Sequence, residues 1–593
     1  MPLTQHPPTF HFEARLGAYQ KQVDTVLHEL TEHRIIERIW ERDPTVWPPA
    51  STTLSNPLGW LQTAPTMRDH LQGIDRFVRD VRAEGFTQVL VLGMGGASLI
   101  PAIFSQAYEA GHEALQLAVL DSTDPSTIDI YTTLFDPAQT LFVVASKSGT
   151  TIETLSLFKH FYNQVAATQQ DREAGRHFVA ITDPQSPLTE LATQHGFREV
   201  FLADAATAGR YAALSPFGLV PAALVGVDLS RVLDHAESMM QACEASRAVE
   251  ANLGTQLGAL LGTLAHAGRD KVTLVASSSL GAFGAWVEQL LAESTGKEGQ
   301  GLIPILSEPL GLPQVYGEDR LFIHLALSGD DEQQNEQILD TIAAAGQPIV
   351  HLHLNDPYEL GGQFFLWEMA TAVAGHYLGI NPFDQPNVDA TKQREQEVVT
   401  TYRDTGTLPE EAPAASFDEL QLYGAINGSS PETILQAFLE QGRAGDYVTF
   451  QAYLPPPITV YHPEQLNPTL TLAIRTTAEI HTVLLSMCAR IRDKYGLAAT
   501  FNYGPQYLHT TGQLHKGDAG RGLFIQLTAD PPQDMPIPAE ADALSSLISF
   551  GALQAAQALE DRRALEAAGR RTMRFHFRSH VVEQLTQLNQ ALL

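Results

Sequence analysis

Two short clusters rich in glycine and hydroxyl side chains stand out, because each follows an apolar run and precedes a helical pattern. They are Gly93-Met94-Gly95-Gly96-Ala97-Ser98 and Ser146-Lys147-Ser148-Gly149-Thr150-Thr151. Glycine lets the backbone approach a ligand closely and turn sharply into a helix, whose free N–H groups attract an anion. The second cluster adds four hydroxyls and a lysine, which is more than one helix cap requires. We interpret it as a phosphate-binding turn, whereas the first cluster fits a turn with or without a ligand.

A dinucleotide cofactor fits this pattern poorly. The first cluster is not a GxGxxG motif, and no acidic residue is clearly placed to hold a ribose. We therefore expect a small phosphorylated ligand rather than a nicotinamide or flavin cofactor.

The overall charge restricts the partners. The chain has 37 Lys and Arg residues against 68 Asp and Glu, a formal net charge of -31. Such a surface repels polyanions, so we expect no nucleic-acid partner. A small anion would bind only where a local group of positive charges overcomes this field.

Cysteine content and hydropathy indicate a soluble protein of a reducing compartment. Cys243 and Cys488 are the only cysteines, and they lack CxxC spacing. We find neither a signal peptide at the start nor an apolar run of about 18 residues, and we expect a cytoplasmic protein without a membrane partner. The histidines, including the pair in His351-Leu352-His353, form no pattern that requires a metal, and we expect no metal site.

Apolar runs alternate with helical patterns, which predicts an α/β protein with parallel sheets. Helical spacing also predicts a helix over Phe12–Arg42, and the closing stretch Ala539–Arg571 is predicted to be helical. Thr45–Pro57 and Thr405–Ser416 have the composition of connectors. The predicted strands are Gln88–Gly93, Leu115–Leu120, Thr140–Ala145, Phe178–Ile181, Lys271–Ala276, Leu321–Leu325, Ile349–Leu354, Tyr447–Tyr453, Ala498–Tyr503 and Leu523–Leu527.

A chain of 593 residues exceeds one hydrophobic core. We predict an N-terminal helical segment at 1–59, α/β units at 60–225 and 226–405, and a C-terminal α/β domain at 406–593. The strand, Pro-rich turn and long helix of the last part echo Ile349–Leu378, so it is predicted to be a partial repeat of the second unit.

Together the two clusters, GMGGASLIP and SKSGTTIET, resemble the sugar-isomerase (SIS-type) domain of the glucose-6-phosphate isomerase family. Three further stretches fit in the family's order, namely 209–218 (GRYAALSPFG), 293–297 (ESTGK) and 381–392 (NPFDQPNVDATK). The resemblance covers about residues 60–400. With GPQYLHTTGQLHKGD at 504–518, the whole chain looks most similar to the isomerase half of bacterial transaldolase–isomerase fusions, and we predict no transaldolase activity.

The resemblance implies three-layer α/β/α SIS-type domains and the interconversion of glucose 6-phosphate and fructose 6-phosphate through a cis-enediol, with no cofactor. A proton moves between C2 and C1, so the reaction needs a base over C2 and cations that face the enediolate. The family pattern implies that Glu293 is this base, Arg210 stabilises the enediolate, Lys392 assists ring opening and Gln385 lies near the phosphate. From the residues alone, a helix-end carboxylate, a surface ion pair and a solvated helix lysine remain alternatives for Glu293, Arg210 and Lys392.

Two departures from the family pattern stand out. Ala97 occupies a position where the family commonly has serine, and Ser98 is expected to substitute for it. No ring-opening histidine is evident between Glu293 and Gln385, where the histidines lie in apolar, strand-like runs. We expect His515 to supply this acid and base, with His509 as the second choice, so that the C-terminal domain takes the role of a neighbouring subunit.

Two other functions remain open. A dual-specificity isomerase would also accept mannose 6-phosphate, because none of these residues obviously distinguishes the configuration at C2. A sugar-phosphate sensor without catalysis would keep the phosphate turn but would not need Glu293, Arg210 and Lys392. For either enzyme we expect a sugar-phosphate ligand and a monomer or homodimer.

Overall fold

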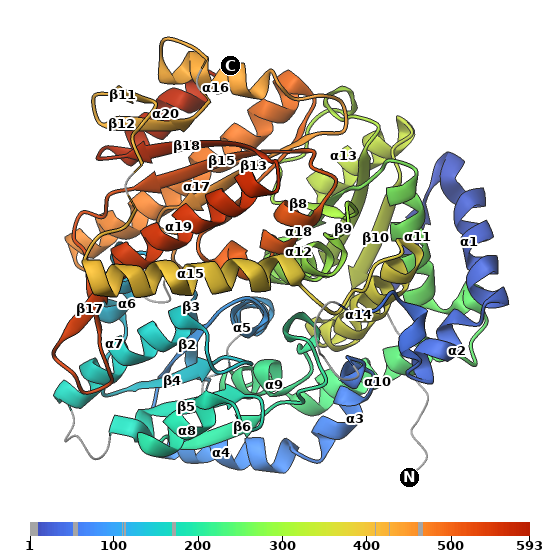
Figure 1. Ribbon diagram of the computed structural model, residues 1–593. Coiled ribbons are helices and arrows are strands. Elements are labelled where there is room, and N and C mark those ends of the chain that lie inside the picture. Colours follow the sequence, from blue (N-terminus) through green and yellow to red (C-terminus); the bar gives the residue numbers. More distant parts are fainter. Residues whose placement is uncertain are drawn as a thin grey trace.

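The computed structural model describes residues 10–50, 57–108, 111, 114–168, 174–409, 411–425, 427–459 and 466–593. Its strands form three larger sheets and one short hairpin, and helices pack on the sheets (Figure 1). Residues 51–56 of the predicted connector 45–57 lie outside the described residues. In the described part of the chain no helix has the length and apolar character needed to cross a bilayer.

The first sheet is wholly parallel and has the order β3-β2-β4-β5-β6. Its strands are β2 (Gln88–Gly93), β3 (Gln116–Leu120), β4 (Thr140–Ala145), β5 (Phe178–Thr182) and β6 (Glu199–Leu202). Helices α4 (Leu71–Ala83), α5 (Gly96–Ala107) and α9 (Pro216–Leu224) share a core with one face of the sheet. Helices α6 (Pro125–Leu134), α7 (Ile152–Thr168) and α8 (Pro187–Gln194) share a core with the other face. Val89 and Val91 lie in one core and Leu90 and Leu92 in the other, as the two-residue period of a strand covered on both faces requires.

The second sheet has the order β1-β10-β9-β7-β8, and only β1 runs antiparallel to its neighbour. Its strands are β1 (His11–Arg15), β7 (Lys271–Ala276), β8 (Ile303–Leu306), β9 (Arg320–Leu327) and β10 (Ile349–Leu354). Its helices are α10 (Leu229–Ala242), α11 (Leu253–His266), α12 (Gly281–Thr295), α13 (Gln333–Ala344) and α14 (Leu360–Tyr377). Helix α14 is buried nearly throughout and packs against α10, α11 and α12.

The prediction of a helix from Phe12 was wrong at its start. His11–Arg15 is a strand that extends the second sheet at β10, and the helices that follow are α1 (Gln20–Glu32) and α2 (Ile35–Trp40). The pairing partner, His353 to Ile349, lies more than three hundred residues away in sequence, so local periodicity could not report it.

The third sheet has the order β11-β12-β18-β15-β13-β14. Its strands are β11 (Ala415–Phe417), β12 (Leu420–Gly424), β13 (Tyr447–Tyr453), β14 (Ala498–Tyr503), β15 (Gly522–Ala529) and β18 (Arg571–Phe577). Its helices are α16 (Pro431–Leu439), α17 (Pro468–Tyr495), α18 (Gly512–Gly517), α19 (Phe550–Ala567) and α20 (Val581–Gln590). The prediction of continuous helix over Ala539–Arg571 was wrong at both ends, because β17 (Ser546–Ser549) pairs with β16 (Pro536–Pro538) before α19 and Arg571 begins β18.

The three sheets share one strand order. The parallel strands follow as β3-β2-β4-β5, β8-β7-β9-β10 and β14-β13-β15-β18, so that in each unit the second strand in the chain lies at one side of the first and the third strand at the other. This is the order of doubly wound nucleotide- and phosphate-binding folds. The prediction of an α/β architecture with parallel sheets is confirmed. We propose that the chain divides into the units predicted from its sequence and that the C-terminal unit repeats the second.

Helix α15 (Pro386–Thr405) connects the second unit to the third and crosses the front of the molecule in Figure 1, between the first sheet and the C-terminal unit. It packs against α18 and α19. Near its start, the backbone N–H of Asn387 donates to the Oε1 atom of Gln513 on α18 at 3.0 Å. The N-terminal turns of α15 are thereby held where all three units meet.

Candidate active site

The first glycine-rich turn follows β2 and touches the C-terminal unit. Gly95 has a φ of 60°, and a Cβ atom built there would lie 2.8 Å from the carbonyl oxygen of His509. A larger residue would therefore be strained twice, by its backbone and by this close approach. Ser98, which we expected to substitute for a serine at Ala97, is buried, and its hydroxyl donates to the carbonyl oxygen of Gly95 at 2.9 Å.

The second turn connects β4 to α7 and is organised by hydroxyl groups. The Ser146 and Thr151 hydroxyls lie 2.9 Å apart, as do those of Ser148 and Thr150. Gly149 has a φ of 69°, and its N–H donates to the Ser146 hydroxyl at 3.1 Å. The turn leads into the N-terminus of the seventeen-residue helix α7, where free N–H groups and the helix dipole favour an anion.

Lys147 does not present an isolated positive charge. Its Nζ atom lies 2.5 Å from Asp183 Oδ2 and also donates to the carbonyl oxygen of Asp204. Burial raises the pKa of Asp183, and the charge and hydrogen bond of Lys147 oppose that rise. The lysine is thus fixed beside the turn by a partner from the loop after β5.

Arg210 is buried at the centre of the site and contacts several of its residues. It is 1% exposed and lies in the 3-10 helix Gly209–Tyr211. Its Nη1 atom lies 2.9 Å from Glu293 Oε1 and 3.1 Å from Gln385 Oε1, so that one guanidinium orients both residues. The other N–H groups donate to the Ser294 hydroxyl at 2.7 Å and to the Pro382 carbonyl oxygen at 2.8 Å.

Glu293 lies near the C-terminal end of α12, with its side chain 12% exposed. Its Oε1 atom pairs with Arg210, and its Oε2 atom accepts from Gln289 Nε2 at 3.0 Å. Gln289 is one helical turn earlier, and its Nε2 also donates to the carbonyl oxygen of His509. The carboxylate is therefore held in one orientation from both sides.

His509 comes from the 3-10 helix Gln506–His509 of the C-terminal unit. Its Nε2 atom lies 2.9 Å from Oε1 of Glu153, a residue of the first turn of α7 that is 2% exposed. Burial alone would raise the pKa of Glu153, but the charge and the hydrogen bond of His509 outweigh it and hold this pKa at about 2. The ionised carboxylate can only accept, so Nε2 of His509 carries the hydrogen and Nδ1 is left for another partner.

Most of the predicted site residues line one cavity of about 320 Å³. They are Gly95, Gly96, Ala97, Ser146, Lys147, Ser148, Thr151, Arg210, Glu293, Gln385, Lys392 and His509. Thr150 lines a smaller cavity that shares Ser148, Thr151, Lys392 and His509 with the first. Six segments far apart in sequence thus converge at the carboxyl ends of β2 and β4, where the strand order of the first sheet reverses.

Three predicted residues lie outside the cavity lining. Ser98 and Gly149 support the two turns from within. His515 is 1% exposed on α18, where its Nδ1 faces the Gln451 amide at 3.3 Å and its ring packs against Phe524. Burial, with the nearby charge of Lys516, lowers the pKa of His515 well below its usual value. The structure therefore does not bring His515 to the site, and the second-choice histidine, His509, is there instead.

Sequence reasoning missed four polar residues of the site. Gln289, Asp183 and Asp389 line the cavity, and Glu153 binds His509 beside it. Glu153 lies in the first turn of α7, just after the SKSGTT turn. Gln289 precedes Glu293 by one helical turn, and this spacing places both on the same face of α12. This spacing could have identified Gln289 as a neighbour of Glu293 from the sequence.

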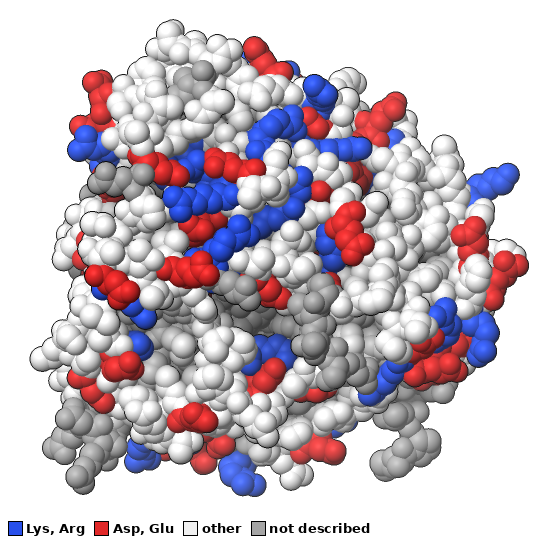
Figure 2. All heavy atoms as spheres, in the orientation of Figure 1, with Lys and Arg blue, Asp and Glu red and all other residues white. Residues whose placement is uncertain are grey.

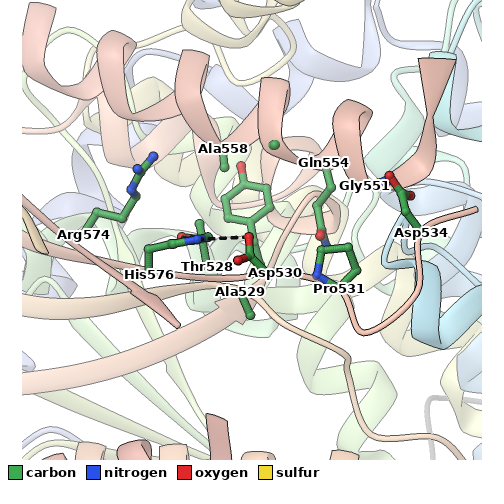
Figure 3. A pocket seen from close by; sticks show the side chains of 12 residues that line it. Thr528, Ala529, Asp530, Pro531, Asp534, Gly551, Gln554, Ala558, Arg574 and His576 are labelled. Atoms are coloured by element: carbon green, nitrogen blue, oxygen red, sulfur yellow. Dashed lines mark hydrogen bonds and ion pairs between the residues drawn. The ribbon is translucent and has the colours of Figure 1, made fainter. Parts of the chain in front are cut away.

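A second cavity, of about 260 Å³, lies at the carboxyl ends of β15 and β18 under α19 (Figure 3). There His576 Nδ1 bonds the Thr528 hydroxyl at 3.0 Å, and its Nε2 lies 3.2 Å from Asp530 Oδ1. The lining contains no glycine- and hydroxyl-rich turn like that after β4.

Figure 2 shows Lys and Arg side chains gathered on one part of the molecular surface, around the position of α19 in Figure 1. Acidic side chains are scattered over the rest of this face. Inside the cavity, Lys147, Arg210 and Lys392 supply three positive charges. Asp183, Glu293 and Asp389 line the same cavity, so its basic and acidic side chains are equal in number.

Comparison with known proteins agrees with this geometry. The model of the phosphoglucose isomerase family matches residues 30–303. The glucose-6-phosphate isomerase of Rubrobacter xylanophilus is 27% identical over 401 residues, which are 60% of this chain and 91% of the relative. That of Thermosynechococcus vestitus is 27% identical over 463 residues, 69% of this chain and 83% of the relative.

Two solved structures share the fold. A glucose-6-phosphate isomerase from Chlamydia trachomatis has a TM-score of 0.58 at 18% identity and covers 67% of this chain and 89% of its own. A hypothetical protein from Thermus thermophilus has a TM-score of 0.56 at 24% identity and covers 67% of this chain and all of its own. The ordered motifs, their convergence in one cavity and the sequence relatives lead to one conclusion: the chain is similar to glucose-6-phosphate isomerases, and its residues 30–303 match the phosphoglucose isomerase family.

Proposed function

We propose that the protein is an aldose–ketose isomerase that interconverts glucose 6-phosphate and fructose 6-phosphate. One observation carries the proposal: the SKSGTT turn and the carboxylate of Glu293 line the same cavity of about 320 Å³. A cavity of that size suits a six-carbon sugar phosphate. The relatives named above as glucose-6-phosphate isomerases support the same reaction.

The phosphate would bind at the turn from Ser146 to Thr151, where hydroxyl groups and the N-terminus of α7 supply donors. This end of the ligand fixes the sugar chain across the cavity towards Glu293. Binding energy from the phosphate, which does not react, would then position the reacting carbons.

Glu293 would take the proton from C2 of the open-chain aldose and return it to C1, which gives the ketose. Its two oxygens are oriented by Arg210 and Gln289, so the carboxylate needs no reorganisation when the sugar binds. The positive charge of Arg210 would also stabilise the enediolate oxygen that forms between the two transfers.

His509 and Lys392 are proposed to open the ring. Ring opening needs a proton delivered to the ring oxygen and another removed from the C1 hydroxyl. With Nε2 of His509 committed to Glu153, Nδ1 is the nitrogen available for this exchange. Both residues belong to this chain, so no neighbouring subunit is needed to supply the histidine.

The test is turnover by the protein and its Glu293→Gln variant, measured with glucose 6-phosphate, fructose 6-phosphate and mannose 6-phosphate. Wild type should interconvert the first two. The variant should lose turnover by at least 10³-fold, which is about 4 kcal/mol of transition-state stabilisation, while a sugar phosphate still binds. Conversion of mannose 6-phosphate at a similar rate would favour dual specificity. Binding without turnover in wild type would favour a sensor and defeat the proposal.

A further inference from the structure

Helix α19 of the C-terminal unit reaches the histidine site through one residue, Gln557. Its side chain is fully buried, and its Nε2 atom donates to Oε1 of Glu153 at 2.7 Å. The same carboxylate oxygen accepts from His509 Nε2 at 2.9 Å. Two donors from the C-terminal unit therefore share one oxygen of a carboxylate that belongs to the first unit.

The orientation of the Gln557 amide follows from its neighbours. Glu153, with a pKa held at about 2, is ionised at neutral pH and can only accept hydrogen bonds. On the other side, the hydroxyl of Thr123, in the loop after β3, lies 3.4 Å from Oε1 of Gln557 and donates to it. Both contacts place the amide nitrogen towards Glu153, so the amide cannot be reversed without losing both.

We propose that Gln557 is a positioning residue that sets the proton affinity of His509 by competing with it for Oε1 of Glu153. This inference rests on the proposed function of His509 in ring opening. A carboxylate that shares its charge with a second donor holds the imidazole N–H less strongly. Loss of the Gln557 donor would therefore strengthen the hydrogen bond from His509 Nε2 to Glu153.

Other charges act on this pair. Lys392 on α15 faces Glu153, and Asp121 in the loop after β3 faces His509. The printed hydrogen bonds of the Gln557 side chain go to Glu153 and Thr123 and to neither of these charged groups, so its replacement leaves both charges in place.

Three variants separate positioning from packing. Gln557→Leu removes the donor but keeps most of the volume, and Gln557→Glu keeps the shape. Gln554→Leu is the matched control, because Gln554 is also buried, lies one turn earlier on α19 and faces Asp124 rather than Glu153. The measurement is the pH profile of kcat/KM for glucose 6-phosphate, together with the His509 titration followed by NMR.

We expect Gln557→Leu to move the midpoint of the pH-profile limb assigned to His509 upward by about one pH unit. The free energy of a hydrogen bond to a charged acceptor corresponds to a shift of about that size. Gln557→Glu should be impaired at high pH and recover as the pH falls, since two adjacent carboxyl groups then share one proton and the new group becomes a donor. Gln554→Leu should leave the pH profile unchanged even if it lowers Tm.

The proposal is overturned if Gln557→Leu and Gln557→Glu both keep the wild-type profile, or if Gln554→Leu shifts it equally. The NMR titration does not require turnover. If wild type proves inactive, the proposed function fails, but an upward shift of the His509 titration in Gln557→Leu still supports the competition for Glu153, and its absence still refutes it.

Discussion

Glu288 offers a direct test of the electrostatics of the interior. It lies on α12, is 5% exposed, and its Oε2 atom accepts from Asn502 Nδ2 at 3.0 Å. Its Oε1 atom has no hydrogen-bond partner among the described residues. Burial raises the pKa of Glu288 to about 8, and the hydrogen bond from Asn502 only partly opposes this.

The direction of the pH effect follows from linkage. Between the ordinary value of 4.5 and about 8, the unfolded chain releases the Glu288 proton while the folded chain keeps it. Stability from this group is therefore full below pH 4.5 and declines as the pH rises towards 8. Over the interval from pH 5 to pH 8 the loss is about 4 kcal/mol, at about 1.36 kcal/mol per pKa unit.

Glu288→Gln should remove this loss, because the amide is neutral at every pH and its oxygen can still accept from Asn502. We expect wild type and variant to have similar Tm at pH 5 and the variant to be more stable by several degrees at pH 8. Thermal unfolding followed by circular dichroism at half-unit pH steps measures this. Other titrating groups are the same in both proteins and cancel in the difference.

Glu308→Gln is the matched control. Glu308 is also buried, but it forms two hydrogen bonds with Arg320, at 2.9 and 3.1 Å. Its replacement should destabilise the protein, because Arg320 would remain buried without its ion-pair partner. Parallel Tm curves for wild type and Glu288→Gln between pH 5 and pH 8 would refute the buried, proton-holding state of Glu288.

Three further predictions concern the site. Gly149→Ala should raise KM for the sugar phosphates about tenfold or more. The left-handed backbone at this position and a Cβ only 2.9 Å from Ser186 would distort the turn from Ser146 to Thr151. An unchanged KM would contradict phosphate binding at this turn. Arg210→Lys should lower kcat about 100-fold although it keeps the charge, because an ammonium cannot reach Glu293, Gln385, Ser294 and the Pro382 carbonyl at once as the guanidinium does. Near-normal kcat would show that charge alone suffices. His509→Asn should strongly reduce turnover of cyclic glucose 6-phosphate, whereas His515→Asn should reduce it little beyond any loss of stability. A coupled assay compares the two variants, with Tm measured in parallel. A larger loss of turnover in His515→Asn than in His509→Asn would support His515 as the ring-opening histidine.

The sequence alone predicted much of the fold because buried parallel strands leave a local signal. Gln88–Gly93 and Thr140–Ala145 each have one polar residue at the start followed by an unbroken apolar run, and the structure has β2 and β4 with these bounds. Such strands are covered on both faces, so apolar residues follow one another without alternation. Where a segment gains its conformation from a distant partner, as His11–Arg15 does from β10, the local pattern predicted the wrong element.

The same division holds for the site. Glu293, Arg210 and the SKSGTT turn were predictable because each lies in a short motif whose residue types have a chemical meaning by themselves. The histidine that lines the cavity was not predictable in this way. His509 and His515 belong to one short stretch, and only the orientation of their side chains distinguishes them. One lies beside Gly95 and bonds Glu153, and the other turns into the core of its own unit.

What the sequence determined by itself is therefore a set of local structures: apolar strands, glycine turns with free donors, and helices with defined polar positions. These depend on interactions between residues close in the chain. Only the tertiary structure decided which histidine meets Glu153 and that Gln557 shares its oxygen. These contacts join residues more than 350 positions apart, and their formation depends on how the third α/β unit packs against the first.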